Sequence, residues 1–315
     1  HREGEGRCPS PARVPPRYSG ATGTIAIMNN VKTAALLTFL GALFVALGYL
    51  LGGATGGLFA LGFAVLFNFG MYFFSDKIAL KASRARPLGE TELPGIRSTV
   101  SSLAQREGLP MPDLYVIDSP QPNAFATGRS PRHAAVAVTT GIVEMLDHRE
   151  LEGVLAHELA HVKNRDILIA TIAATLAAAL SLLARMAFWS NLGGRRSNDN
   201  PIAGILGIVS IIVVPIAAAL LQMAISRSRE FEADRDGAAA TGSPLALASA
   251  LQKISVGTQR HPMLVNPAVS QLFISDPMKA FSRGSRQGQF SKMFSTHPPV
   301  GERIDRLERM ASGIS

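Results

Sequence analysis

Four long apolar runs dominate the pattern of hydrophobic and polar positions along the chain. Residues 34–51 and 56–74 contain no charged side chain, and each run is long enough to cross a hydrocarbon core of about 30 Å. Only Gly52-Gly53-Ala54-Thr55 separates them, which predicts a tight helical hairpin. Two further runs, residues 167–189 and 201–225, are weaker candidates for membrane spans, because their Ala-rich faces also suit a partly buried hairpin.

The two polar segments, residues 76–166 and 226–315, alternate short strand patterns with amphipathic helix patterns. The first is expected to form a helix, then a small sheet, then a second helix. The second is expected to be helical, with a final amphipathic helix after Pro299. The strands are predicted at Leu114–Ile117, Asn123–Thr127 and Ala135–Thr139. The sequence therefore predicts a mainly α membrane protein with four transmembrane helices and one α+β domain.

Residues 1–27 are rich in proline and arginine and lack an apolar period, so we expect them to be disordered. Met28 follows directly, and we interpret it as the natural start of the protein. The expected organisation is then a first transmembrane hairpin over 28–75, polar segment 76–166, a second hairpin over 167–225 and polar segment 226–315.

His157-Glu158-Leu159-Ala160-His161 is the main candidate for chemistry. Apolar residues at helical spacing surround it, and in a helix positions four apart lie on the same face. The two imidazoles are then able to bind one metal ion, while Glu158 reaches a water molecule on it. This is the H-E-x-x-H arrangement of zinc peptidases. The third apolar run begins six residues after His161, so we expect the helix to run straight toward the membrane.

A catalytic zinc ion takes three protein ligands, so a further ligand is needed. Glu230 and Asp234 lie four apart on a predicted helix: Glu230 is able to complete the shell, and Asp234 to accept the ring N–H of a ligand histidine. Glu232 is the competing ligand, although it points away from that face. The alternative is a solvated helix start in which neighbouring arginines pair with these acids.

Composition and charge place the chain at a membrane. Hydrophobic residues make up 47% of it and charged residues 17%, and the net charge of +8 comes from basic residues beside the apolar runs. No nucleic-acid motif or single basic patch is present. By the positive-inside rule, both polar segments face the cytoplasm, where they can form one domain. The single cysteine, Cys8, excludes an intramolecular disulfide and a cysteine metal cluster.

The predicted strand that begins at Asn123 is a candidate for substrate binding. The edge strand of a small sheet can pair with an extended peptide. Asn123, Ala124 and Phe125 are then expected to contact the substrate. Equally, these strands could serve only to pack against the helix that carries the two histidines.

Four motifs together resemble the HtpX heat-shock membrane proteases of bacteria, relatives of the prenyl-protein endopeptidases. They are the stretches 157–161, 228–234, 123–128 and 295–299, and the resemblance covers Met28 to about residue 311. It implies a cytoplasm-facing, zincin-like endopeptidase of the bacterial inner membrane. It implies zinc, one ion per chain, held by His157, His161 and Glu230. The implied substrates are misfolded or damaged membrane proteins.

The expected mechanism has Glu158 as the general base for a zinc-bound water. The family pattern also has a histidine at His297, which we consider either as a donor to the negatively charged transition state or as a structural loop residue. Two other functions compete with this reading. A prenyl-protein endopeptidase would act on a different substrate class. A non-catalytic membrane scaffold would have no need of a base at Glu158.

Overall fold

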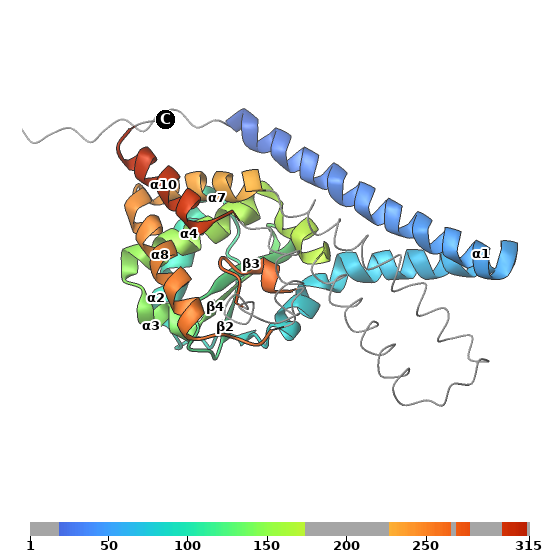
Figure 1. The fold of residues 1–315 in the computed structure, drawn as a ribbon, viewed down its shortest axis with the longest axis horizontal. Coiled ribbons are helices and arrows are strands. Elements are labelled where there is room, and N and C mark those ends of the chain that lie inside the picture. Colours follow the sequence, from blue (N-terminus) through green and yellow to red (C-terminus); the bar gives the residue numbers. More distant parts are fainter. Residues whose placement is uncertain (1–18, 174–226, 266–268, 278–297, 314–315) are drawn as a thin grey trace, which may run out of the picture.

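The computed structural model describes residues 19–173, 227–265, 269–277 and 298–313. The described chain has two parts (Figure 1): a long helical hairpin and an α+β body that packs against its open end. The third and fourth apolar runs lie outside the described residues from position 174 onward. The described residues therefore show one hairpin of the predicted two.

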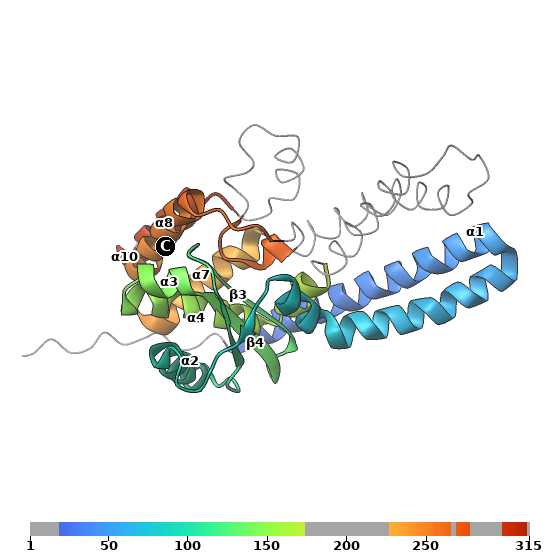
Figure 2. The ribbon, with the colours of Figure 1, turned by 90° about the horizontal axis from the view of Figure 1, so that it is seen from below.

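The hairpin is α1 (Ser19–Ala82), which is folded back on itself at Gly52 and Gly53. Both glycines have non-helical backbone angles, and Gly53 has a φ of 60°, which favours a residue without a Cβ atom. The two arms lie side by side (Figure 2), as the sequence predicts. Residues 1–27 were expected to be disordered. This is wrong for residues 19–27, because α1 already begins at Ser19.

Side chains from both arms interlock along the hairpin. The Phe44 ring contacts Phe63 and Phe67 edge-on at centroid distances of 5.2 and 5.3 Å. Near the turn of the hairpin, Gly48 and Gly56 let the two backbones approach so closely that a Cβ atom on Gly48 would collide with the other arm. Aromatic contacts and glycine-mediated approach are the means by which apolar helices associate without a hydrophobic driving force.

The outward faces of the hairpin are apolar and exposed. Leu58, Phe59 and Leu66 are 70%, 78% and 73% exposed. Two segments, Ile27–Ala46 and Gly52–Ala82, are long and apolar enough to cross a membrane. An exposed apolar surface of this extent is expected to be covered by lipid.

The body contains a four-stranded sheet in the order β1-β2-β4-β3. Its strands are β1 (Arg86–Pro87), β2 (Asp113–Ile117), β3 (Ala124–Ser130) and β4 (His133–Thr139). β2 and β4 are parallel and the other pairs are antiparallel. The three predicted strands are confirmed. The two-residue β1 is too short to carry an alternating pattern, so no local signal predicts it.

Helices pack around this sheet (Figure 1). They are α2 (Pro94–Glu107), α3 (Thr140–Met145), α4 (His148–Asn164), α7 (Arg227–Thr241), α8 (Pro244–Arg260), the short η1 (Val269–Leu272) and α10 (Val300–Ala311). α4 lies in the middle and contacts β3, α7 and α8. Its buried residues, among them Val154, Leu155 and Leu159, form the core with the sheet and with Leu247 and Leu251 of α8.

Both ends of α4 are fixed by local hydrogen bonds. A capping box joins Asp147 and Glu150 at the start. At the other end, Arg165 adopts the left-handed conformation and its N–H bonds to the carbonyls of His161 and Val162. A new helical segment starts at residue 167. The expectation that α4 runs straight toward the membrane is therefore wrong, because the chain turns at Arg165.

The close approach at Gly48 can be tested by adding one methyl group. Gly48→Ala places a Cβ atom against the Ala60 side chain and the Gly56 carbonyl, and overpacking of this kind costs about 1–3 kcal/mol. Gly62→Ala on the same hairpin meets nothing within 4 Å and is the matched control. Thermal unfolding in detergent should show a lower Tm for Gly48→Ala alone. An equal Tm for both variants would exclude tight packing at the turn.

Candidate metal centre

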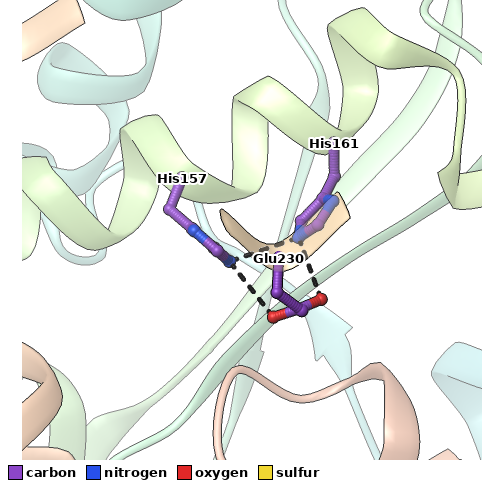
Figure 3. A group of neighbouring side chains, drawn as sticks. All are labelled: His157, His161 and Glu230. Atoms are coloured by element: carbon purple, nitrogen blue, oxygen red, sulfur yellow. Dashed lines mark hydrogen bonds and ion pairs between the residues drawn. The ribbon is translucent and has the colours of Figure 1, made fainter. Parts of the chain in front are cut away.

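His157 and His161 lie one turn apart on α4, and their imidazoles point to the same side (Figure 3). The two Nε2 atoms are 3.2 Å apart. The His157 side chain is 1% exposed and that of His161 is 17% exposed. His157 is therefore closed off from solvent, and His161 is partly open to it.

Glu230 of α7 faces both imidazoles (Figure 3). Its Oε1 lies 3.6 Å from His161 Nε2 and its Oε2 lies 4.0 Å from His157 Nε2. Gly237 makes this possible, because any Cβ atom there would press on the His157 backbone within 3 Å. Within the described residues, these three are the group whose donor atoms all lie within 4.8 Å of one another.

The three donors fit a metal ion. Two nitrogens bound to one tetrahedral zinc ion at about 2.0–2.1 Å are about 3.3 Å apart, close to the separation seen here. Two imidazoles and one carboxylate also match the donor set of catalytic zinc sites, which keep a fourth position open. The geometry of the side chains therefore supports a metal centre at this position.

The buried charges around the three donors also favour a metal ion at this position. Each charged side chain in the cluster is at most 7% exposed: Glu158, Asp166, Glu230, Asp234, Arg229 and Arg303. With neutral imidazoles, four carboxylates and two guanidinium groups leave two net negative charges in a buried place. Uncompensated buried charge is costly, and a divalent cation would neutralise it.

His157 is held from behind by Asp234 and Arg303. Its Nδ1 donates to Asp234 Oδ1 at 2.9 Å, and Arg303 Nη2 and Nε donate to the two oxygens of Asp234 at 2.7 and 2.8 Å. Burial alone would raise the pKa of Asp234, but the Arg303 charge and hydrogen bonds lower it to about 2. Asp234 therefore remains a carboxylate, which fixes Nδ1 as the protonated nitrogen and leaves Nε2 free to bind a metal.

His161 has its own carboxylate partner, Asp166, which the sequence analysis did not identify. The His161 Nδ1 lies 2.9 Å from Asp166 Oδ2. Burial lowers the pKa of His161, but Asp166 and the other nearby carboxylates outweigh it and raise the pKa to about 10. The carboxylates around His161 therefore favour a positive charge at this imidazole, which either a proton or a metal ion can supply. The ion pair of Arg303 with Asp234 was also not predicted, because the two residues are 69 positions apart in the sequence.

Glu158 points from the same helix into the sheet side of the centre. It is 2% exposed, and burial is the main cause of its raised pKa. The backbone of Ala126 in β3 hydrogen-bonds to its carboxyl group and acts in the opposite direction. Its position beside the two histidines and its raised proton affinity suit a group that accepts and returns a proton.

Asn123, Ala124 and Phe125, the expected substrate contacts, lie inside the body. All three are 0% exposed. The Asn123 side chain donates to the Ser275 carbonyl at 2.7 Å, and the Ala124 carbonyl accepts from Ile274 at 2.9 Å. The chain's own segment thus covers this end of the β3 edge, a tertiary contact that no local pattern reveals. His297 lies outside the described residues, so its two possible roles stay predictions.

The chain is similar to a known protein family and to several known proteins. The model of Peptidase family M48 matches residues 90–311. A Protease HtpX homolog of Thermodesulfovibrio yellowstonii is 50% identical over 286 residues, which are 90% of this chain and 99% of the relative. Another from Ralstonia pickettii is 50% identical over 288 residues, 90% of this chain and 98% of the relative. The crystal structure of S. mikatae Ste24p aligns at 20% identity with a TM-score of 0.48, over 90% of this chain and 67% of that chain.

The ligand role of Glu230 predicts a difference between two neighbouring glutamates. Glu230→Ala should lower the metal content of the purified chain, because a third donor is lost. Glu232→Ala is the matched control, since Glu232 is partly exposed and does not belong to the donor group. Metal content measured by elemental analysis separates the two. Full occupancy in Glu230→Ala, or a loss confined to Glu232→Ala, would move the third ligand elsewhere.

Proposed function

This chain belongs to peptidase family M48 and is a membrane-associated metalloprotease of the HtpX type; we propose that its metal is zinc, held by His157, His161 and Glu230. The observation that carries the proposal is the convergence of these three donors with Glu158 in one buried cluster. When bound, zinc would lower the pKa of a coordinated water and polarise the peptide carbonyl.

Glu158 performs the proton transfers in this proposal. Its carboxylate accepts the proton of the attacking water and later returns it to the leaving amine, so one group serves as base and acid. The raised pKa of Glu158 helps the first of these steps, because a more basic carboxylate holds the proton more firmly. Asp234 and Asp166 keep the Nδ1 positions of the two histidines protonated, so that both Nε2 atoms face inward.

A protease acts on protein substrates, and we propose that these are misfolded or damaged membrane proteins. Two features support this class. The exposed apolar hairpin leads directly into the body that carries the metal centre (Figure 2), so the centre lies near the lipid surface. The family resemblance, carried by four separate motifs, also implies quality control of membrane proteins under stress. Asn123, Ala124 and Phe125 do not contact substrate in this proposal; they hold the β3 edge in place.

The proposed location is the bacterial inner membrane, with the body on the cytoplasmic side. Support comes from the basic residues that follow the second arm of the hairpin, among them Lys77, Lys81 and Arg84, because such residues remain in the cytoplasm. The four-span arrangement, with a second hairpin over 167–225, is part of this proposal. An even number of spans brings both polar segments to the same side.

The role of Glu158 predicts that Glu158→Gln separates metal binding from catalysis. The amide keeps the size of the side chain but cannot accept a proton, so cleavage of an unfolded protein should fall by about 10²–10⁴-fold. Zinc content should equal that of the unaltered chain, since Glu158 is not a ligand. A variant that cleaves at a near-normal rate would falsify the role of Glu158 as general base.

The orientation predicts opposite labelling of two positions. In a chain with Cys8→Ser, a cysteine at Glu90 should react with a membrane-impermeant maleimide only after the cytoplasmic side is opened. A cysteine at Ala54, in the turn of the hairpin, should react from outside intact cells. Detergent-solubilised protein controls for reactivity at both positions. The reverse pattern would contradict the cytoplasmic placement of the body.

A further inference from the structure

Asp166 lies where the helix that carries the two histidines ends. α4 ends at Asn164, and Arg165 turns the chain in the left-handed conformation with φ 57° and ψ 30°. The Asp166 N–H then donates to the His161 carbonyl at 3.4 Å, while Asp166 Oδ2 accepts from His161 Nδ1 at 2.9 Å. A residue with a Cβ atom adopts this backbone conformation only at a cost. The turn is thus held in a strained form that brings the Asp166 carboxylate onto His161.

Two other elements hold the same turn. Asn29, from the first arm of α1, donates from Nδ2 to the Asn164 carbonyl at 3.2 Å. The Asn164 side chain in turn donates to Asp236 Oδ2 of α7 at 3.4 Å. Asn29 and Asn164 are 3% and 2% exposed. A buried polar side chain on an apolar helix is costly unless it is hydrogen-bonded, so Asn29 fixes where the first arm meets α4.

We propose that Asp166 is a positioning residue for the ligand His161, and that Asn29 holds the turn that carries it. The first apolar helix then contributes to the metal affinity of the centre. The inference rests on the proposed function, because it takes His161 as a ligand. It goes beyond that function because it gives Asn29, a residue of the membrane hairpin, a role in holding the metal site in place.

The physical reason lies in the two nitrogens of His161. Its Nε2 faces His157 and Glu230, and its Nδ1 faces Asp166. With the Nδ1 proton committed to Asp166, the Nε2 lone pair is available for the metal and the ring is held at one angle. Without Asp166, this partly exposed imidazole gains other tautomers and rotamers, and the preorganisation of the three donors is lost.

Zinc affinity tests the first half of the proposal without any substrate. The full chain in detergent is stripped of metal and titrated with zinc against a chromophoric chelator. Asp166→Ala should weaken zinc binding by about 10–100-fold, the usual effect of removing such a partner. Asp166→Asn should lose less, because its amide oxygen can still accept from Nδ1. Asp113→Asn, an exposed aspartate in β2, is the control and should bind zinc normally.

Asn29→Ala tests the second half, with the adjacent exposed Asn30→Ala as its matched control. Loss of a single neutral hydrogen bond corresponds to about 2- to 10-fold weaker zinc binding, expected for Asn29→Ala and not for Asn30→Ala. Because Asn29 acts through the turn, the double variant with Asp166→Ala should bind no more weakly than Asp166→Ala alone. Fully additive losses would overturn the link between the two residues.

A purely structural role for Asp166 gives a different result. Asp166→Ala and Asp166→Asn would then lower the Tm of the metal-free chain while zinc affinity in the folded fraction stays normal, and this outcome overturns the proposal. Normal zinc affinity in Asn29→Ala overturns the part assigned to the hairpin. Failure of the unaltered chain to bind zinc contradicts the proposed metal site itself, and so is distinct from failure of the inference alone.

Discussion

The close packing of α7 on α4 is the constraint on which the centre depends. Two histidines four apart on a helix offer two donors, but the third must come from another element at the correct distance. Gly237 lets the α7 backbone lie against the backbone of His157, where any side chain would force the helices apart. Glu230 lies about two turns earlier on α7 and so reaches both imidazoles. Tertiary packing at a glycine thereby determines the chemistry of the site.

This packing also buries charge, and the pairing of those charges divides the centre into two unlike halves. On the His157 side, Asp234 is neutralised by the fully buried Arg303 of α10, so the imidazole is held in a closed and balanced ion pair. On the His161 side, Asp166 lies near Arg229. Burial lowers the pKa of Arg229, and the charges of Asp166 and Glu230 act in the opposite direction. The excess negative charge is therefore expected to be satisfied by a cation between the two histidines.

Local patterns in the sequence predict the parts of this molecule that depend on local geometry. The hairpin follows from two apolar runs around Gly52-Gly53, and the inward face of α4 from the spacing of His157 and His161. The pairing of Glu230 with Asp234 on one face also follows from helical periodicity. Asp166 does not, because five residues after His161 is not a helical spacing; its contact depends on the left-handed turn at Arg165. The burial of Asn123 depends on the distant Ser275, which no local pattern shows.

The two halves also differ in their access to solvent. His157 is closed off by Asp234, Arg303 and α10, whereas the His161 side chain retains 17% of its exposure. The Glu158 carboxyl group is hydrogen-bonded to the backbone of Ala126 in β3, and its burial raises its pKa. The closed half holds the His157 ring at one angle, and the His161 half is the part of the cluster that solvent reaches.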